Sequence, residues 1–427
     1  MRYLSHTKAD REEMRRAIGV RHIDDLFADV PASALIKEHA NLPHHQGEVD
    51  VETALKSMAD KNTPAGSVPF FLGAGAYRHH VPATVDYIIQ RSEFLTSYTP
   101  YQPEIAQGTL MYLYEFQTYV ANLTGMDVAN ASMYDGATSL TEAVLMTQRI
   151  TRKDNVTIAE GLHPHYAETL DTYLQNTPAK KRVADKPQAG DTAFVIQTPD
   201  FYGTPHSLDD IRKACDDVGA KLIVVFTEVL SLGLLPAPTE ADIVVGDGQS
   251  IGVGLNYGGP HLGLFACREQ YTRQMPGRLC GKTTDADGKV GYVLTLNTRE
   301  QHIRREKATS NICTNVGLCA LAFTVHMSLL GEEGFKTLAL RNHEKACQLA
   351  AALEEIDGVK VENTAFFNEF SVKLPTDDAF AVVEKLSANN VIAGHPLPDG
   401  KLLVAVTETT TDAHIQTLCK ELTEVLS

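Results

Sequence analysis

Short apolar runs alternate with longer amphipathic stretches from residue 69 to about residue 300. The runs "TAFVIQTPD" (192–200), "KLIVVFTE" (221–228) and "ADIVVGD" (241–247) are typical of buried strands, whereas "SLDDIRKACDDVG" (207–219) is typical of a helix. Strands that alternate with helices of this length predict βαβ units and a mostly parallel sheet covered on both faces. We therefore predict a large α/β domain over residues 66–325. Two more strand-helix pairs fit this alternation, at 128–136 with 137–150 and at 155–160 with 163–175.

The two ends of the chain show other patterns. Residues 7–19 predict a helix that begins at the N-cap Thr7 and ends at Gly19, and no strand pattern occurs before residue 65. We expect a helical N-terminal arm over residues 1–65. A long helical pattern over 314–356 is followed by a β-α-β-α pattern, which predicts a small α+β domain over residues 326–427. Its expected elements are 367–375, 377–390, 401–408 and 411–426.

Composition narrows the classes of partner and location. The net charge is −16, from 54 acidic and 38 basic residues, and the basic clusters are short. Nucleic acid and anionic membrane are therefore not expected as partners. The charged N-terminus lacks the apolar segment of a secretory signal, and no apolar run reaches the ~20 residues that cross a bilayer. Seven cysteines without paired spacing indicate free thiols, so we expect a cytoplasmic protein.

Three stretches carry residue types suited to ligand binding. Gly136, Ala137 and Thr138 stand where a predicted strand turns into a helix, a place where free N–H groups can hold a phosphate; an ordinary capped helix start is the alternative. The segment "FLGAGAYRHH" (71–80) does not match a dinucleotide-binding loop, because Arg78 stands where such a loop has its third glycine. The histidine pairs at 44–45 and 79–80, with His163 and His165, lack metal-ligand spacing, which favours packed or solvated side chains.

The glycine-rich stretch "DIVVGDGQSIGVGLNYGGPHLGLFACR" (242–268) joins two predicted strands but contains no lysine. In its other features the chain resembles the fold-type-I enzymes of pyridoxal phosphate, in which a lysine after such a strand holds the cofactor as a Schiff base. More specifically, the chain resembles the P-protein, the glycine decarboxylase of the glycine cleavage system, in its N-terminal half or subunit 1. The matching stretches are 3–31, 71–82, 96–118, 134–143, 257–266 and 291–314.

This resemblance implies a degenerate cofactor pocket. It places Gln249 at the lysine position, with Ser250 after it, and an amide cannot form a Schiff base. It also places His163 where a residue stacks on the pyridine ring and Glu228 where an aspartate faces the pyridine nitrogen. A helix cap and a strand-end carboxylate are the alternatives for these two residues. Lys282 and Lys307 are alternative Schiff-base lysines, although neither directly follows the strand before the glycine loop.

The resemblance further implies that catalysis is shared with a second chain. A homologous subunit 2 would carry pyridoxal phosphate, an α2β2 heterotetramer would form, and the lipoyl group of the H-protein would accept the aminomethyl group of glycine. Two other classes remain open: a structural or regulatory partner, and a stand-alone pyridoxal phosphate enzyme, which the absent lysine disfavours. Two segments are expected to reach the partner's cofactor, and their candidate catalytic residues are Tyr98, Tyr101, Arg304, Arg305 and Lys307.

Overall fold

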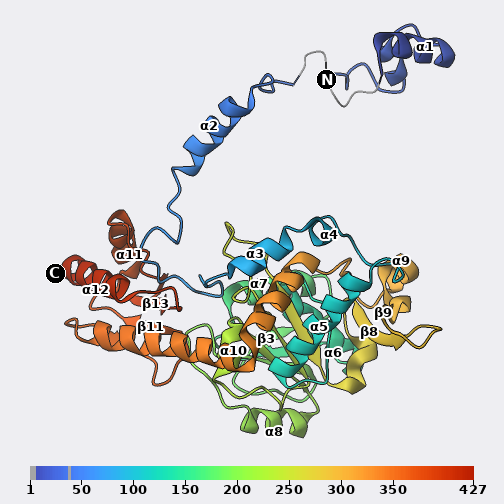
Figure 1. Cartoon of the computed structure of the whole chain (residues 1–427). Helices are drawn as coiled ribbons and strands as arrows, with labels where there is room; N and C mark the ends of the chain where they lie inside the picture. Colours follow the sequence, from blue (N-terminus) through green and yellow to red (C-terminus); the bar gives the residue numbers. More distant parts are fainter. Residues whose placement is uncertain (1–5, 37–39) are drawn as a thin grey trace. The chain divides into compact units, whose positions relative to one another are not determined.

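The computed structural model describes residues 6–36 and 40–427 and separates the chain into two compact units, 1–63 and 64–427 (Figure 1). The described part of the first unit contains helix α1 (Lys8–Ile18), the 3-10 helix η1 (Ile23–Phe27) and helix α2 (Glu48–Ala59), without a strand. Thr7 caps α1 by accepting from the Asp10 N–H at 3.2 Å, and Gly19 ends it at φ +87°. The predicted helix at 7–19 is confirmed. Residues 1–5 and 37–39 of the predicted arm lie outside the described part.

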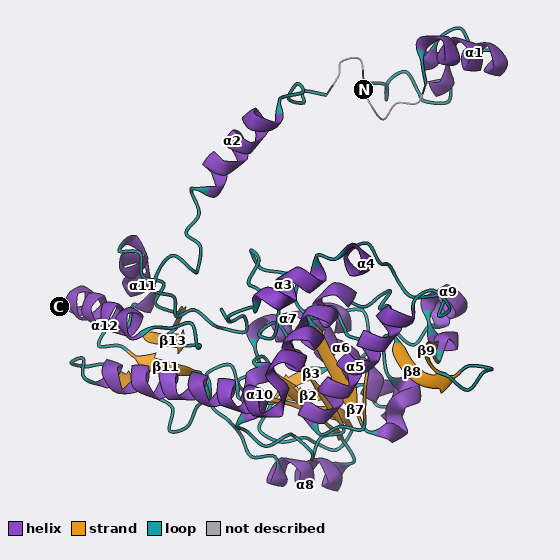
Figure 2. Cartoon of the chain, viewed as in Figure 1, coloured by secondary structure: helices purple, strands orange, loops and turns teal. Residues whose placement is uncertain are grey.

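A seven-stranded sheet organises the second unit, in the order β1-β7-β6-β5-β4-β2-β3. Figure 2 shows strands of this sheet, among them β2, β3 and β7, lying among the helices of the unit. Strands β2 to β6 are parallel to one another, β7 is antiparallel to β6, and β1 is antiparallel to β7. The predicted mostly parallel sheet is confirmed. The strands are β1 (Val128–Ala129), β2 (Asn155–Ile158), β3 (Lys181–Val183), β4 (Asp191–Gln197), β5 (Lys221–Phe226), β6 (Ile243–Asp247) and β7 (Gly263–Cys267).

Helices cover both faces of this sheet because successive strand residues point in opposite directions. Phe194 and Val224 pack on one face against α5 (Gln107–Thr124) and α10 (Gly317–Glu354). Val195 and Ile223 pack on the other against helices α6 and α7. Burying a side chain of this size contributes about 1.5–3 kcal/mol, so the two clusters hold the sheet between its helices. The bounds of the remaining helices here are α6 (Gly136–Thr151), α7 (Pro164–Leu174) and α8 (Asp209–Val218).

A two-stranded hairpin, β8 (Leu279–Thr284) and β9 (Val290–Thr295), extends from this core and was not predicted. The Asp287-Gly288 pair between two β-rich runs is the signal that marks its turn, and Gly288 adopts φ +80°. The short elements of this region are α3 (Ala83–Ile89), α4 (Ser92–Leu95), η2 (Val229–Gly233), η3 (Glu269–Gln274), η4 (Asn297–Arg299), α9 (Gln301–Arg304) and η5 (Arg305–Lys307).

The C-terminal part contains a four-stranded antiparallel sheet in the order β10-β11-β13-β12. The predicted β-α-β-α pattern is confirmed and gains two short strands. Helix α10 runs through the predicted boundary at 325–326 and departs from helical geometry at Gly331, so this boundary stays a prediction. No helix in the described ranges combines the length and apolar character needed to cross a membrane. The elements are β10 (Lys360–Val361), β11 (Glu369–Lys373), α11 (Ala379–Ala388), β12 (His395–Leu397), β13 (Lys401–Ala405) and α12 (Asp412–Leu426).

Candidate functional site

The carboxyl ends of the parallel strands meet at one edge of the sheet, where α/β proteins of this kind bind ligands. His163 follows β2, Glu228 follows β5, and Gln249 follows β6. All three side chains are buried. The structure therefore brings these three predicted residues to the same edge, as parallel strand topology requires.

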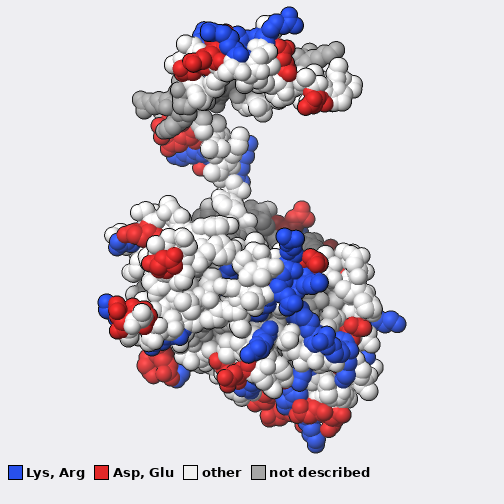
Figure 3. All heavy atoms as spheres, turned by 90° about the vertical axis from the view of Figure 1, so that its right-hand side faces the viewer, with Lys and Arg blue, Asp and Glu red and all other residues white. Residues whose placement is uncertain are grey.

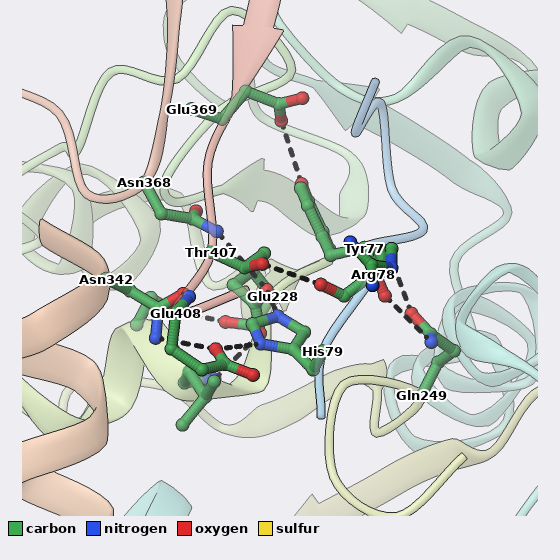
Figure 4. Close-up of polar contacts among 12 residues, drawn as sticks. Tyr77, Arg78, His79, Glu228, Gln249, Asn342, Asn368, Glu369, Thr407 and Glu408 are labelled. Atoms are coloured by element: carbon green, nitrogen blue, oxygen red, sulfur yellow. Dashed lines mark hydrogen bonds and ion pairs between the residues drawn. The ribbon is translucent and has the colours of Figure 1, made fainter. Parts of the chain in front are cut away.

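Gln249 does not face an open pocket, because its amide is bound to the chain's own backbone. Oε1 accepts from the Tyr77 N–H at 2.9 Å, and Nε2 donates to the Tyr77 carbonyl at 3.0 Å and the Val253 carbonyl at 2.8 Å. These bonds use both polar atoms of the side chain. Gln249, the residue expected at the lysine position, thus fastens the segment 71–80 across the carboxyl edge of the sheet (Figure 4).

His163 is held by the same segment. Its Nε2 lies 2.8 Å from the Ala74 carbonyl, and its Nδ1 accepts from the His165 N–H at 3.1 Å. These partners require a neutral ring that carries its proton on Nε2. Burial lowers the pKa of His163, which agrees with a neutral ring. A Cβ on Gly75 would lie 2.7 Å from Nε2, so the segment passes directly against the imidazole.

Glu228 forms part of a buried ionic group that also includes His79 of segment 71–80. His79 lies between two carboxylates, with Nε2 3.0 Å from Oε2 of Glu228 and Nδ1 2.8 Å from Oε2 of Glu408 (Figure 4). Burial alone would lower the pKa of His79, but Glu228 and Glu408 outweigh it and raise the pKa to about 10. Burial likewise opposes ionisation of Glu408, yet His79 lowers the pKa of Glu408 to about 2. The carboxylate that was expected to face a pyridine nitrogen thus pairs with His79 of the same chain.

Tyr77 connects this group to the C-terminal sheet. Its hydroxyl donates to Oε2 of Glu369 at 2.8 Å, and the Ala74 N–H donates to Oε1 of the same carboxylate at 2.6 Å. Burial raises the pKa of Glu369 to about 7, although these two bonds act in the opposite direction. A Cβ on Gly73 would lie 2.4 Å from the carboxylate, so only glycine fits at this crossing. The sequence predicted neither Tyr77, His79 nor Glu369 as part of the site.

The N-terminus of α6, the predicted phosphate cradle, is occupied by carboxylates. The Gly136 N–H donates to Oδ2 of Asp247 at 3.1 Å, and the Thr138 N–H donates to Oδ1 of Asp135 at 2.7 Å. A Cβ on Gly136 would lie only 1.9 Å from the Tyr166 hydroxyl. Two of the three N–H donors predicted to hold a phosphate, those of Gly136 and Thr138, already have anionic acceptors, and the space beside Gly136 is filled.

Pyridoxal phosphate consequently does not fit the pocket of this chain. There is no lysine at position 249, the segment 73–79 lies against the three residues that would surround the ring, and two carboxylates would repel the phosphate.

The other predicted residues of this pocket supply no cofactor or metal site. Ser250 is buried beside Gln249, and its hydroxyl has no partner in the described part of the chain. Lys282 lies on β8, paired with Tyr292 of β9, and Lys307 is exposed in η5, so neither replaces the missing amine. The described residues contain no cluster of His, Cys, Asp and Glu that could hold a metal.

The second set of predicted residues lies on the surface of the unit 64–427. Tyr98 is 80% exposed and Tyr101 is 52% exposed, while Arg304, Arg305 and Lys307 are all exposed. The two segments do meet, because the Tyr101 ring packs edge-on against His302 with centroids 5.6 Å apart. Figure 3 shows lysine and arginine gathered on the face that carries α9, β8 and β9, although the chain as a whole is acidic.

The family model for the glycine cleavage system P-protein matches residues 1–422. A protein of Caulobacter vibrioides named "probable glycine dehydrogenase (decarboxylating) subunit 1" is 57% identical, with 100% of each chain covered. The protein of the same name from Rhodospirillum centenum is 56% identical over the same coverage. A crystal structure of glycine decarboxylase (P-protein) in inhibitor-bound form superposes with a TM-score of 0.92 at 40% identity, covering 100% of both chains. The glutamate decarboxylase of Lactobacillus brevis, at 11% identity and a TM-score of 0.69 over 94% of this chain and 97% of that one, shares the fold.

Proposed function

Because the chain belongs to the glycine cleavage system P-protein family, we propose that it acts as subunit 1 of a two-chain glycine dehydrogenase (decarboxylating). The single observation that carries this division of labour is the amide of Gln249, which lies at the lysine position and is bound to the Tyr77 backbone. A chain built in this way cannot hold the cofactor covalently. The reaction therefore requires a second chain that can.

The partner in this proposal is a homologous subunit 2 that carries pyridoxal phosphate on a lysine, and the two chains form an α2β2 heterotetramer. The cofactor supplies an electron sink for the loss of CO2 from glycine. The lipoyl group of the H-protein then accepts the aminomethyl group. The seven cysteines are all free in the structure, which supports a reducing compartment and hence the cytoplasm as the location of the complex.

The contribution of this chain to the shared site comes from its surface. Tyr98 and Tyr101 present exposed phenols, and Arg304, Arg305 and Lys307 present cations on the same part of the unit. Such groups suit an anionic cofactor and an anionic substrate. The buried group around His79 has a separate task in this proposal, because it closes this chain's own pocket and gives the neighbouring segments a rigid support.

The proposal is tested by glycine-dependent exchange of CO2 measured with each purified chain alone and with the two mixed. We expect no exchange from this chain alone and exchange from the mixture, in the presence of lipoylated H-protein. Exchange by this chain alone would overturn the proposal. Exchange by subunit 2 alone at the rate of the mixture would assign this chain a purely structural or regulatory role.

A further inference from the structure

Arg278 is a buried cation that ends the loop before β8. It is 3% exposed, and its guanidinium donates to Oγ1 of Thr314 at 2.7 Å, to the Cys313 carbonyl at 2.7 Å and to the Tyr101 hydroxyl at 3.2 Å. Its own carbonyl accepts from the Ala131 N–H at 2.9 Å, which fixes its backbone to the segment that leads into α6. The side chain therefore has a defined position, and all these partners are electrically neutral.

No carboxylate of the described residues forms an ion pair with Arg278. Two partly buried arginines of this chain do have such partners: Arg212 pairs with Asp216 and Asp242, and Arg182 pairs with Asp191. The buried Arg299 forms no ion pair among the described residues, but its guanidinium donates to the Gly277 carbonyl at 2.9 Å. A buried charge is unfavourable unless an opposite charge compensates it. A guanidinium also carries five N–H donors, more than the three bonds that Arg278 makes. The site around Arg278 thus has a positive charge and donors to offer to an anion that this chain does not supply.

Tyr101 links this buried cation to the surface. The Arg278 guanidinium lies 5.4 Å from the centroid of the Tyr101 ring, and His302 packs edge-on against the same ring. Thr314 extends the network, because its hydroxyl is 3.3 Å from that of Thr99, whose carbonyl accepts from the Tyr101 N–H at 2.9 Å. Contacts with Arg278, His302 and Thr99 thereby hold the half-exposed ring of Tyr101 over the buried guanidinium of Arg278.

We propose that Arg278 is a positioning residue that holds Tyr101 as the donor of an anion site, completed when the partner subunit's active site closes over this surface. The ligand is an anionic oxygen group, which is the shared chemistry of the glycine carboxylate and the cofactor phosphate. The Tyr101 hydroxyl donates to this group, and Arg278 supplies the compensating charge behind the ring. This inference rests on the proposed function, because the anion is brought by the second chain or by its substrate.

The test uses the assembled complex of both chains with the variants Arg278→Gln, Arg278→Lys and Tyr101→Phe. Arg212→Gln is the matched control, because it removes a partly buried arginine that already has carboxylate partners. We measure the KM and kcat for glycine and, separately, the Kd of pyridoxal phosphate for the complex after removal of the cofactor. The Kd measurement requires no turnover, so it stands even if the complex fails to decarboxylate glycine.

For Arg278→Gln we expect at least about a 10-fold rise in one of these two constants, the loss expected when a charge-assisted interaction disappears. A higher glycine KM with unchanged kcat and cofactor Kd identifies the substrate carboxylate, and a higher cofactor Kd alone identifies the phosphate. Arg278→Lys should recover part of the loss, Tyr101→Phe should lose less than Arg278→Gln, and the control should match wild type. Unchanged KM and Kd in Arg278→Gln, or a fall in kcat alone that Arg278→Lys shares, would overturn the inference.

Discussion

Gln249 and Tyr77 pair through an amide and a peptide group, with the Gln249 side chain accepting from the Tyr77 N–H and donating to the Tyr77 carbonyl. These two bonds resemble the pair of bonds between residues of adjacent β-strands, except that the Gln249 side-chain amide takes the place of one backbone. The pairing closes the site where a related chain would bind its cofactor, and it does so at the one position whose residue type decides whether a Schiff base can form.

Replacing Gln249 by lysine alone will not create a cofactor site. The lysine cannot accept from the Tyr77 N–H, and its ammonium would be buried without a carboxylate partner, which costs about 1–3 kcal/mol or more. We expect a lower free energy of unfolding and no absorbance of bound pyridoxal phosphate. Gln148→Lys, a partly exposed change on α6, is the control and should alter stability by less than about 0.5 kcal/mol. A stable Gln249→Lys chain that binds the cofactor would show that segment 73–79 leaves the pocket easily.

The ion pairs of His79 predict a loss of stability at alkaline pH. The pKa of His79 is raised from its ordinary 6.5 to about 10 in the folded chain, so its stabilising effect is complete below pH 6.5 and disappears as the pH rises through 10. We expect the free energy of unfolding of wild type to fall by about 2–4 kcal/mol between pH 7 and pH 10, from denaturant titrations at each pH.

His79→Gln is the variant that isolates this effect. It removes the titrating group, so its unfolding free energy should be lower at pH 7 and much flatter up to pH 10. Glu369, whose burial raises its pKa to about 7, is present in both proteins, so the difference between wild type and His79→Gln isolates the effect of His79. An equal fall in wild type and in His79→Gln would show that another group is responsible.

A side chain added at Gly136, the first residue of α6, should clash with Tyr166. Its added Cβ would lie 1.9 Å from the Tyr166 hydroxyl, so Gly136→Ala should lower the free energy of unfolding by about 1–3 kcal/mol. Gly108→Ala in α5 is the matched control, because no atom lies within 4 Å of its Cβ, and it should stabilise by about 0.5–1 kcal/mol. Tyr166→Phe should restore part of the loss in Gly136→Ala. Equal effects of the two alanines in thermal or denaturant unfolding would contradict this explanation.

Substitutions in the two surface segments should lower the activity of the complex without preventing its assembly. Tyr98→Phe and Arg305→Ala change exposed side chains, so the complex should still elute as wild type from a size-exclusion column. Glycine-dependent CO2 exchange should fall by about 10-fold if either group contacts the substrate or cofactor of the partner. Lys420→Ala, an exposed change on α12, is the control. Wild-type kcat/KM in both variants would reduce this chain's surface to a scaffold.

The fold followed from the sequence because buried strands and amphipathic helices have distinct periods, and strand topology then placed His163, Glu228 and Gln249 at one edge. The residues that surround these three side chains could not be predicted from the sequence. Segment 71–80 has no periodic pattern, and its contacts with Glu228, Glu369 and Glu408 join residues about 150 to 330 positions apart. Arg278 was missed for a related reason, since burial of a single arginine between neutral partners leaves no local signal in the sequence.

Borohydride reduction of the assembled two-chain complex, followed by peptide mapping of both chains by mass spectrometry, shows most directly which chain holds the cofactor. Reduction fixes pyridoxal phosphate to whichever lysine holds it. We expect one pyridoxyl group per subunit 2 and none on this chain, because Gln249 and the segment that it binds leave neither the amine nor the space for the cofactor. A stoichiometric pyridoxyl adduct on Lys282, Lys307 or any other lysine of this chain would contradict this expectation.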